Sequence, residues 1–315
     1  MLQFEKLGVI LKPVDNLHAK FNTGALLLND KVHLLYRWAE IPEQTGGFGP
    51  KYLQNYISYA QMTPEGKLLR DDDRPIFEAT HQWEKVGLED PRIFRLDGKN
   101  YITYTAWDGK QARVAFATVN DDFTEFKKIG IVPAKKSDKD AFFFPERING
   151  KIAYVHRFEP NIQIDYFDNI DDLFDEEFWN NYEPDENGSV AMTGIYEWEK
   201  GKIGGSVPPI RTELGWLFVY HGVGHDRHPF CYRGGIALLD INDPHKILAR
   251  LPYPVLEPTE DYEIHGDVDN VVFPCGGYIH DGYLYLVYGG ADKVTALARC
   301  KYDDIIAELK NHIGK

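Results

Sequence analysis

The feature that most constrains the fold of this chain is a hairpin pattern that recurs five times. Each copy has an alternating apolar run, a short polar or glycine-containing turn, and a second run rich in Tyr, Leu and Val. The five turns lie at Asn29-Asp30, Asp97-Gly98, Asn149-Gly150, Leu214-Gly215 and Asp281-Gly282. Asn-Gly and Asp-Gly between alternating runs are strong hairpin signals, and a spacing of roughly 50 to 70 residues suits propeller blades.

Further strand-like runs fill the intervals between these hairpins, for example at 56–60, 113–117 and 235–239. Each unit therefore holds about four antiparallel strands, as a propeller blade does. The sequence predicts an all-β fold, a single five-bladed β-propeller over residues 1–315, with a short C-terminal helix at 302–313. Two β-sandwiches are the alternative, although no change in composition marks a boundary between them.

Composition and charge restrict the class of partner. The 315 residues are 43% hydrophobic and 14% aromatic, which supports a large ordered core, and the formal net charge of −14 argues against nucleic acid as a partner. Cys231, Cys275 and Cys300 lack metal-type spacing and are expected to be buried thiols. With neither a signal peptide nor a membrane-length apolar run, the chain is predicted to be cytoplasmic, with no membrane partner.

Each second strand of a hairpin ends in residues that core packing does not explain. Equivalent strand ends approach one another at the centre of a propeller, so these residues would form one polar pocket for a small molecule. They are Arg37, Trp107, Asp108, His156, Arg157, His221 and Asp292. The alternative is a set of salt bridges between blades.

A second concentration of charge lies at 87–94, with the sequence Gly-Leu-Glu-Asp-Pro-Arg-Ile-Phe. Pro91 fixes its own φ and favours an extended Asp90 immediately before a strand. A tight turn with a surface ion pair is the simpler interpretation.

Several cations suggest an anion site near these strand ends. Arg157, Arg211, His221 and Arg233 are candidates to hold phosphate, since arginine offers forked hydrogen bonds, and Lys139 is a weaker candidate. The spacing of His225 and His228 suits a metal poorly, and the sequence has no P-loop or dinucleotide fingerprint. We therefore expect no metal and no cofactor.

At this point the motifs resemble those of glycoside hydrolase family 130, the β-mannoside phosphorylases and related mannosidases. The resemblance runs in order over most of the chain. The matching segments are 87–93, 139–141, 144–148, 156–157, 208–212, 220–223, 232–233 and 270–274. The family fold is a five-bladed β-propeller, the number of units that the hairpin count predicts.

The resemblance implies that the chain cleaves β-mannosides with inorganic phosphate and inverts the anomeric centre to give α-mannose 1-phosphate. Asp90 matches the family acid, which passes its proton through a mannose hydroxyl and needs a raised pKa. Arg92 would orient Asp90 or close the pocket. The phosphate ligands would be Arg157, Arg211, His221 and Arg233. Asp292 matches a residue that binds mannose, while Arg37, Trp107 and Asp108 are expected sugar contacts.

One departure from the family pattern leaves an alternative activity open. Phosphorylases of the family often carry an arginine in the strand near 56–60, and this chain has none there. The rival is an inverting hydrolase, whose base we would place at Glu263 beside the substrate. A non-catalytic sugar-binding propeller is the third possibility.

The expected partners are a β-mannoside oligosaccharide, with β-1,2 favoured over β-1,4 linkage, and inorganic phosphate as co-substrate. A homo-oligomer is possible. Loops at 41–52 and 165–193 are expected to set the choice of acceptor sugar.

Overall fold

The computed structural model describes residues 1–41, 54–184, 188–224, 226 and 230–315. It consists mainly of β-strands with a few short helices, so the predicted all-β class is confirmed. The loop predicted to cover the pocket at 41–52 lies, apart from Ile41, outside the described residues.

The strands form antiparallel groups of four that follow the order of the chain. The first group is β2 (His18–Leu28), β3 (Lys31–Glu40), β4 (Gln54–Met62) and β5 (Leu68–Pro75), and the second is β6 (Gly87–Leu96), β7 (Lys99–Trp107), β8 (Ala112–Val119) and β9 (Phe126–Ile131). One parallel pairing, between Asn55 and Gly87, joins these two groups into an eight-stranded sheet.

Three separate four-stranded sheets complete the fold. They are β10 (Lys139–Phe143), β11 (Ile152–Arg157), β12 (Ile162–Phe167) and β13 (Val190–Met192); then β14 (Lys202–Arg211), β15 (Trp216–Gly224), β16 (Cys231–Leu239) and β17 (Ile247–Arg250); and finally β18 (Val272–His280), β19 (Tyr283–Gly290) and β20 (Val294–Lys301) with β1 (Glu5–Leu11). The N-terminal strand β1 therefore closes the last sheet by pairing with β20.

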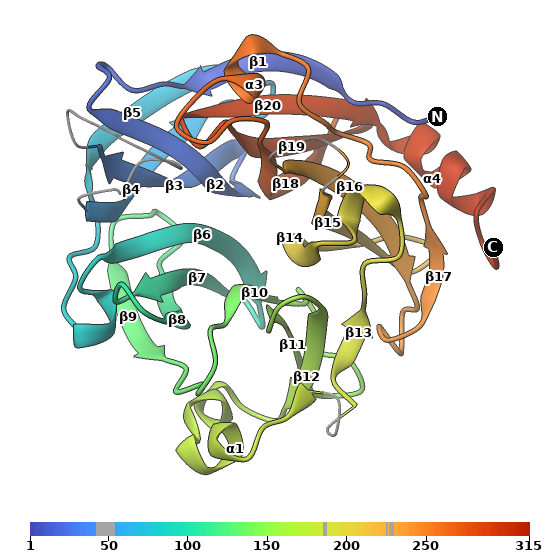
Figure 1. Cartoon of the computed structure of the whole chain (residues 1–315), viewed down its shortest axis with the longest axis horizontal. Helices are drawn as coiled ribbons and strands as arrows, with labels where there is room; N and C mark the ends of the chain where they lie inside the picture. The colour runs from blue at the N-terminus through green and yellow to red at the C-terminus, as the bar shows by residue number, and fades with distance from the viewer. Residues whose placement is uncertain (42–53, 185–187, 225, 227–229) are drawn as a thin grey trace.

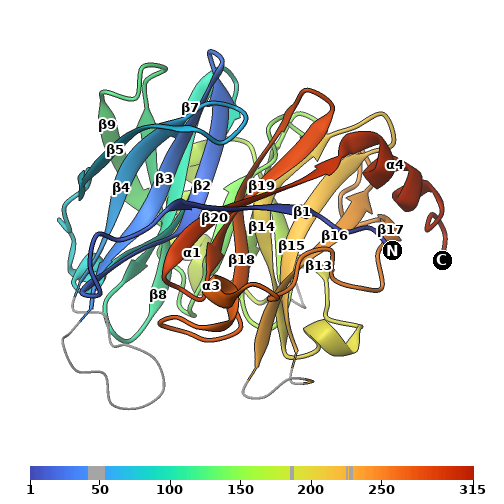
Figure 2. The same cartoon turned by 90° about the horizontal axis from the view of Figure 1, so that it is seen from above.

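The five groups surround a common centre (Figure 1). Their first strands contact one another in cyclic order, because β2 touches β6, β6 touches β10, β10 touches β14, β14 touches β18, and β18 returns to β2. Figure 2 shows the molecule turned by 90°, and in this view the strands run roughly parallel to the axis around which the groups are arranged. The first strand of every group therefore lines the inside of the ring.

The two-residue turns follow the predicted chemistry. Both central residues have positive φ at Asn29-Asp30, Asp97-Gly98, Asn149-Gly150 and Asp281-Gly282, which is the geometry of the hairpin turns that match strand twist. The third hairpin differs from its prediction, because residues 145–148 form only an isolated bridge between Ile148 and Lys151 and the strand itself lies earlier, in β10.

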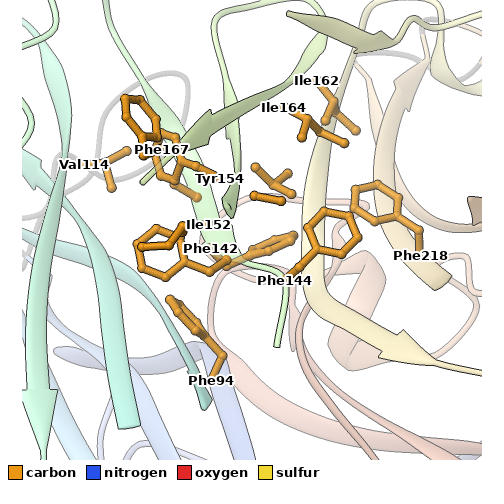
Figure 3. Close-up of a cluster of buried hydrophobic side chains, with 14 of the residues drawn as sticks. Phe94, Val114, Phe142, Phe144, Ile152, Tyr154, Ile162, Ile164, Phe167 and Phe218 are labelled. Carbon is orange, nitrogen blue, oxygen red and sulfur yellow. The ribbon is translucent and has the colours of Figure 1, made fainter. Parts of the chain in front are cut away.

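Aromatic and branched side chains fill the space between neighbouring sheets. Phe94 from β6 lies beside Phe142 and Phe144 from the β10 region, with Tyr154 and Phe218 completing the contact, and all are buried (Figure 3). This apolar packing joins successive groups of strands and places their inner ends in fixed positions.

Short helices lie between strands, and one follows the last strand. They are the 3-10 helices η1 (Gln82–Glu84), η2 (Ile170–Phe174) and η3 (Glu197–Glu199), and the α-helices α1 (Glu176–Asn180), α3 (Asp261–Ile264) and α4 (Tyr302–Lys310). Helix α4 is the predicted C-terminal helix and packs Ile305 and Leu309 inward. Within the described residues, none of these helices is long and apolar enough to cross a membrane.

Three of the groups share a buried charge cluster, which we call the Glu–Tyr–cation cluster. In each, a glutamate at the third position of the preceding helix accepts backbone N–H groups at the helix start, a tyrosine hydroxyl from the second strand, and a cation from the fourth strand. The sets are Glu84, Tyr104 and Lys128; Glu199, Tyr220 and Arg250; and Glu263, Tyr288 and Lys6. The glutamates are at most 1% exposed.

Candidate active site

The site begins with a β-bulge that recurs in the first strand of each group. In every one, the pairing with the second strand slips, at one point in β2, β6, β10 and β18 and at two points in β14. In the first three groups the slip contains Asn22, Asp90 or Asp140, each with a φ of about +50°. A bulge re-aims a side chain next to a functional site, and Asn and Asp tolerate this backbone region better than most residues.

This geometry corrects the prediction for Asp90. Its φ is +50°, in the left-handed region, and it lies inside β6 between the pairs Glu89–Thr105 and Arg92–Thr103. The expected extended conformation before a strand is therefore wrong. Pro91 lacks an N–H, and a bulge is one of the few places in a sheet where proline is accepted.

A pocket of about 290 Å³ opens at this end of the strands. All five groups of strands contribute to its wall, which brings together residues that are up to 270 positions apart in the chain. The charged members are Arg37, Asp90, Lys139, Asp140, Arg157, Glu159, Lys202 and Asp292, and the others are Asn22, Phe230, Tyr232, Val268, Val271 and Phe273. A concave site with several convergent charges suits a small polar ligand.

Asp90 is held by its neighbours from three directions. Its Oδ1 accepts from Asn22 Nδ2 at 2.9 Å and lies 3.2 Å from Arg37 Nη1, while Arg92 Nη1 donates to its main-chain oxygen at 2.8 Å. Arg92 is 1% exposed and also donates to Ser206 O, so it lies behind the pocket wall and fixes the backbone of Asp90. Of the two roles predicted for Arg92, orientation of Asp90 is the one that this geometry fits.

The charge around Asp90 differs from the expectation of a raised pKa. Burial would raise the pKa of the Asp90 carboxyl, but Arg37, Lys139 and Arg92 outweigh burial, and the pKa falls below its usual value. Glu89 takes part indirectly, since it accepts from Arg37 at 3.0 Å and from Lys139 at 3.2 Å. In the unliganded protein Asp90 is therefore a carboxylate at neutral pH.

The carboxyl that does carry a raised pKa is Asp292. Burial raises the pKa of Asp292 to about 7; Arg37 opposes this shift, and the Asp90 carboxylate adds to it. Asp292 lies in the turn after β19 with a φ of +52°. The pocket thus combines ionised carboxylates, among them Asp90, with one carboxyl that titrates near neutrality, Asp292.

Arg157 is positioned by a buried network at the end of β11. Its Nη1 lies 2.8 Å from Asp140 Oδ2 and 3.2 Å from His221 Nε2. Arginine can only donate, so His221 Nε2 accepts, and the proton on Nδ1 faces Ser206 Oγ at 3.1 Å. Asp140 remains ionised, because Arg157, His221 and Arg92 lower its pKa to about 2 against the effect of burial.

His221 does not carry the charge that was predicted for it. Burial lowers the pKa of His221 to about 3, and its side chain is fully buried. It is therefore a neutral acceptor behind Arg157 and does not line the pocket. The prediction of a phosphate-binding cation at this position is corrected to a residue that orients Arg157.

Two of the predicted phosphate ligands lie elsewhere. Arg211 is at the far end of β14 from Lys202, a distance of the order of 25 to 30 Å at strand rise, and pairs with Glu146. Arg233 follows Tyr232 in β16, so its side chain points to the opposite face, where it makes two bonds to Asp226 at 2.9 and 3.0 Å. Neither side chain lines the pocket.

Three further predicted contacts also lie outside the pocket wall. Glu263 belongs to a Glu–Tyr–cation cluster with Lys6 and Tyr288 and is fully buried, which rules it out as a base in contact with substrate. Asp108 accepts from the backbone N–H groups of residues 110 and 111 at 2.8 Å and so stabilises a turn. Trp107 is adjacent to the wall, with its ring 5.8 Å from Lys139 Nζ.

Several residues that the structure places in the pocket wall were not predicted as site residues, among them Asn22, Asp140, Glu159 and Lys202. Asn22 and Asp140 are small polar residues at the fifth position of β2 and the second position of β10, where each adopts a positive φ. Lys202 starts β14 and lies at the inner end, where the strand order alone could have indicated it.

Metal chemistry has no ready site in the described part of the chain, because no three His, Cys, Asp or Glu side chains there are grouped to hold an ion. His225 and His228 lie outside the described residues. The three cysteines are buried free thiols, as predicted.

Comparison with known proteins agrees with this geometry. A family profile described as β-1,4-mannooligosaccharide phosphorylase matches residues 3–311. A 1,2-β-oligomannan phosphorylase of Thermoanaerobacter sp. (strain X514) is 35% identical over 291 residues, which is 91% of each chain. A β-1,2-mannobiose phosphorylase of the same organism is 35% identical over 286 residues, or 89% of each chain.

A solved structure extends the similarity to three dimensions. The β-1,2-mannobiose phosphorylase of Listeria innocua, in complex with β-1,2-mannobiose, superposes with a TM-score of 0.79 at 25% identity and covers 99% of this chain and 100% of its own. On the strength of the family match over nearly its whole length, the chain belongs to glycoside hydrolase family 130.

Proposed function

We propose that this chain is an inverting β-mannoside phosphorylase, which cleaves mannobiose or manno-oligosaccharides with inorganic phosphate to give α-mannose 1-phosphate. The observation that carries the proposal is the pocket itself, because Asp90 and the cations Arg157, Lys139 and Lys202 line one cavity of about 290 Å³. The relatives that match over most of the chain are named as phosphorylases of β-1,2-linked mannosides, so we place β-1,2 ahead of β-1,4 linkage.

In this proposal the propeller is a single catalytic domain with five blades, one for each antiparallel group of four strands. The cyclic contacts of β2, β6, β10, β14 and β18 support this number. A propeller explains why each group contributes its inner end to the same pocket.

The proposed roles follow from position and charge. Phosphate is the nucleophile, and we place it against Arg157 and Lys202, with Lys139 nearby, because these side chains point into the cavity from neighbouring sheets. Asp90 and Asp292 are assigned to the mannose ring and its hydroxyls, and Arg37 acts on both, since it lowers the pKa of each carboxyl. No metal and no cofactor enters the proposed reaction.

Asp90 is assigned as the acid even though its pKa is low in the unliganded protein. Arg37, which lowers it, is shared with Glu89 and with the Asn55 side chain, and a mannose unit would add its own hydroxyl between Asp90 and the scissile oxygen. The family resemblance implies this relay through a hydroxyl. Asp292 supplies a second carboxyl that is half protonated near pH 7.

The rival hydrolase would need a carboxylate that activates water in place of phosphate. The base predicted for it, Glu263, is saturated by Lys6, Tyr288 and backbone N–H groups. The loss of that candidate weakens the hydrolase relative to the phosphorylase.

The test is product analysis on β-1,2-mannobiose and β-1,4-mannobiose with and without inorganic phosphate. We expect α-mannose 1-phosphate from the β-1,2 compound only when phosphate is present. Free mannose released at a rate independent of phosphate would overturn the proposal in favour of a hydrolase.

A further inference from the structure

Two of the cations assigned to phosphate, Arg157 and Lys202, are paired with a carboxylate of the protein. Glu159, two residues beyond the end of β11, places its Oε1 2.9 Å from Lys202 Nζ and 3.2 Å from Arg157 Nη2. One carboxylate oxygen therefore bridges two cations that come from different sheets, as a phosphate oxygen would.

The other donors of Arg157 are directed away from this position. Its Nη1 faces Asp140 and His221 in the buried network, and its Nε has no hydrogen-bond partner among the described residues. Nη2 is thus the Arg157 donor that faces Glu159 at the pocket, and Glu159 occupies it.

Glu159 differs from the other pocket carboxylates in how firmly it is held. Its side chain is 56% exposed and lies in a turn, whereas the side chains of Asp90 and Asp140 are 11% and 2% exposed and lie in strands. Water and salt reach the Glu159 carboxylate and screen its attraction to Arg157 and Lys202, whose side chains are 6% and 26% exposed. Glu159 can therefore leave its cations at low cost.

We propose that Glu159 is an internal competitor for phosphate, whose carboxylate occupies the Arg157–Lys202 anion site in the empty enzyme and leaves it when phosphate binds. This inference rests on the proposed phosphorylase function. It identifies a residue that sets the affinity for phosphate while making no contribution to the bond cleavage itself.

Two consequences separate this role from that of a phosphate ligand. Removal of the Glu159 charge frees Arg157 and Lys202 and should strengthen phosphate binding, whereas removal of a true ligand weakens it. The rate at saturating phosphate should change little, since Glu159 has already moved aside at that point.

The experiment measures initial rates of phosphorolysis against phosphate concentration for the wild type, Glu159→Gln and Glu159→Ala. We expect the KM for phosphate to fall about 2- to 5-fold in both variants, the size of one weak ion pair, with kcat within about twofold of wild type. Glu146→Gln is the matched control, because Glu146 forms an exposed ion pair with Arg211 at the other end of the sheets; its KM should equal that of wild type.

The outcomes separate the two proposals. If the wild type makes sugar phosphate but both Glu159 variants keep or raise the KM for phosphate, the competitor role is overturned and the phosphorylase stands. If the wild type cleaves mannobiose without using phosphate, the proposed function itself fails. Calorimetric titration of inorganic phosphate into the unliganded wild type and Glu159→Gln should show the same gain in affinity.

Discussion

The pocket and the Glu–Tyr–cation clusters contain the same types of charged residue, but these residues have different functions in the two places. In the Glu263 cluster, one carboxylate accepts from Lys6, from the Tyr288 hydroxyl and from two backbone N–H groups, and the glutamate is fully buried. In the pocket, Asp90, Arg157 and Lys202 come from three sheets and face a cavity of about 290 Å³. The clusters are closed, and the pocket is open.

The difference lies in whether charge is satisfied inside the protein. A buried carboxylate with all its acceptor sites used stabilises one geometry and has nothing left to offer a ligand. The pocket charges also have partners, such as Asn22 for Asp90 and Asp140 for Arg157, but they line the cavity, and the Glu159 carboxylate that bridges Arg157 and Lys202 is 56% exposed. Charged residue type is therefore a poor guide to function, and saturation of hydrogen bonds is a better one.

The largest expected effect is on Asp90. Asp90→Asn removes the proposed acid while preserving its shape, so we expect kcat for phosphorolysis of β-1,2-mannobiose to fall by about 10²- to 10⁴-fold. Binding of mannobiose, measured by calorimetry, should stay within about threefold of wild type. Full activity in this variant would mean that the acid lies elsewhere in the pocket.

The next effect is on stability and comes from the closed clusters. Glu263→Gln leaves Lys6 and Tyr288 without their charged partner, and breaking a buried pair costs about 3 to 5 kcal/mol. We expect a corresponding fall in the free energy of unfolding in a urea titration. Lys6→Met added to Glu263→Gln should recover part of the loss, since it removes the stranded cation.

A smaller effect is expected in the pH dependence of stability. The folded-state pKa of Asp292 is about 7, while an unfolded aspartate has its usual value near 3.8. Between these values the native state binds more protons than the unfolded state, so the free energy of unfolding falls as pH rises from about 4 to 7. The urea midpoint of the wild type should therefore fall relative to that of Asp292→Asn as the pH rises from 5 to 8. A constant difference would contradict the raised pKa.

The smallest effect is predicted for Arg211, which pairs with Glu146 far from the cavity. Arg211→Ala should leave the KM for phosphate within about twofold of wild type, and stability within about 1 kcal/mol, as for an exposed ion pair. A tenfold rise in this KM would restore Arg211 as a phosphate ligand and contradict the placement of the anion site.

The hairpin pattern predicted much of the fold because turn residues act locally. Asn29-Asp30, Asp97-Gly98 and Asp281-Gly282 adopt positive φ for reasons that lie within two residues. The sheet closure by β1 and β20 depends on residues almost 300 positions apart and has no local signal.

The site was predicted in part. Arg37, Arg157 and Asp292 line the pocket as their positions near the ends of second strands suggested, and Asp90 joins them from the bulge inside β6. Arg211 lies at the end of β14 away from the pocket, as the direction of that strand requires. Arg233 lies on the face of β16 opposite to that of Tyr232, because side chains alternate along a strand. The saturation of Glu263 and the neutrality of His221 depend on tertiary burial and could not be read from the sequence.

The most direct test of the contrast between the open pocket and the closed clusters measures activity per folded molecule in Asp90→Asn and Glu263→Gln side by side. The folded fraction is taken from the unfolding curve of each preparation, and phosphorolysis is followed under the same conditions. We predict that Asp90→Asn is folded and inactive, and that Glu263→Gln is less stable but turns over at the wild-type rate per folded molecule. A stable but inactive Glu263→Gln would contradict this account and place catalysis at the cluster.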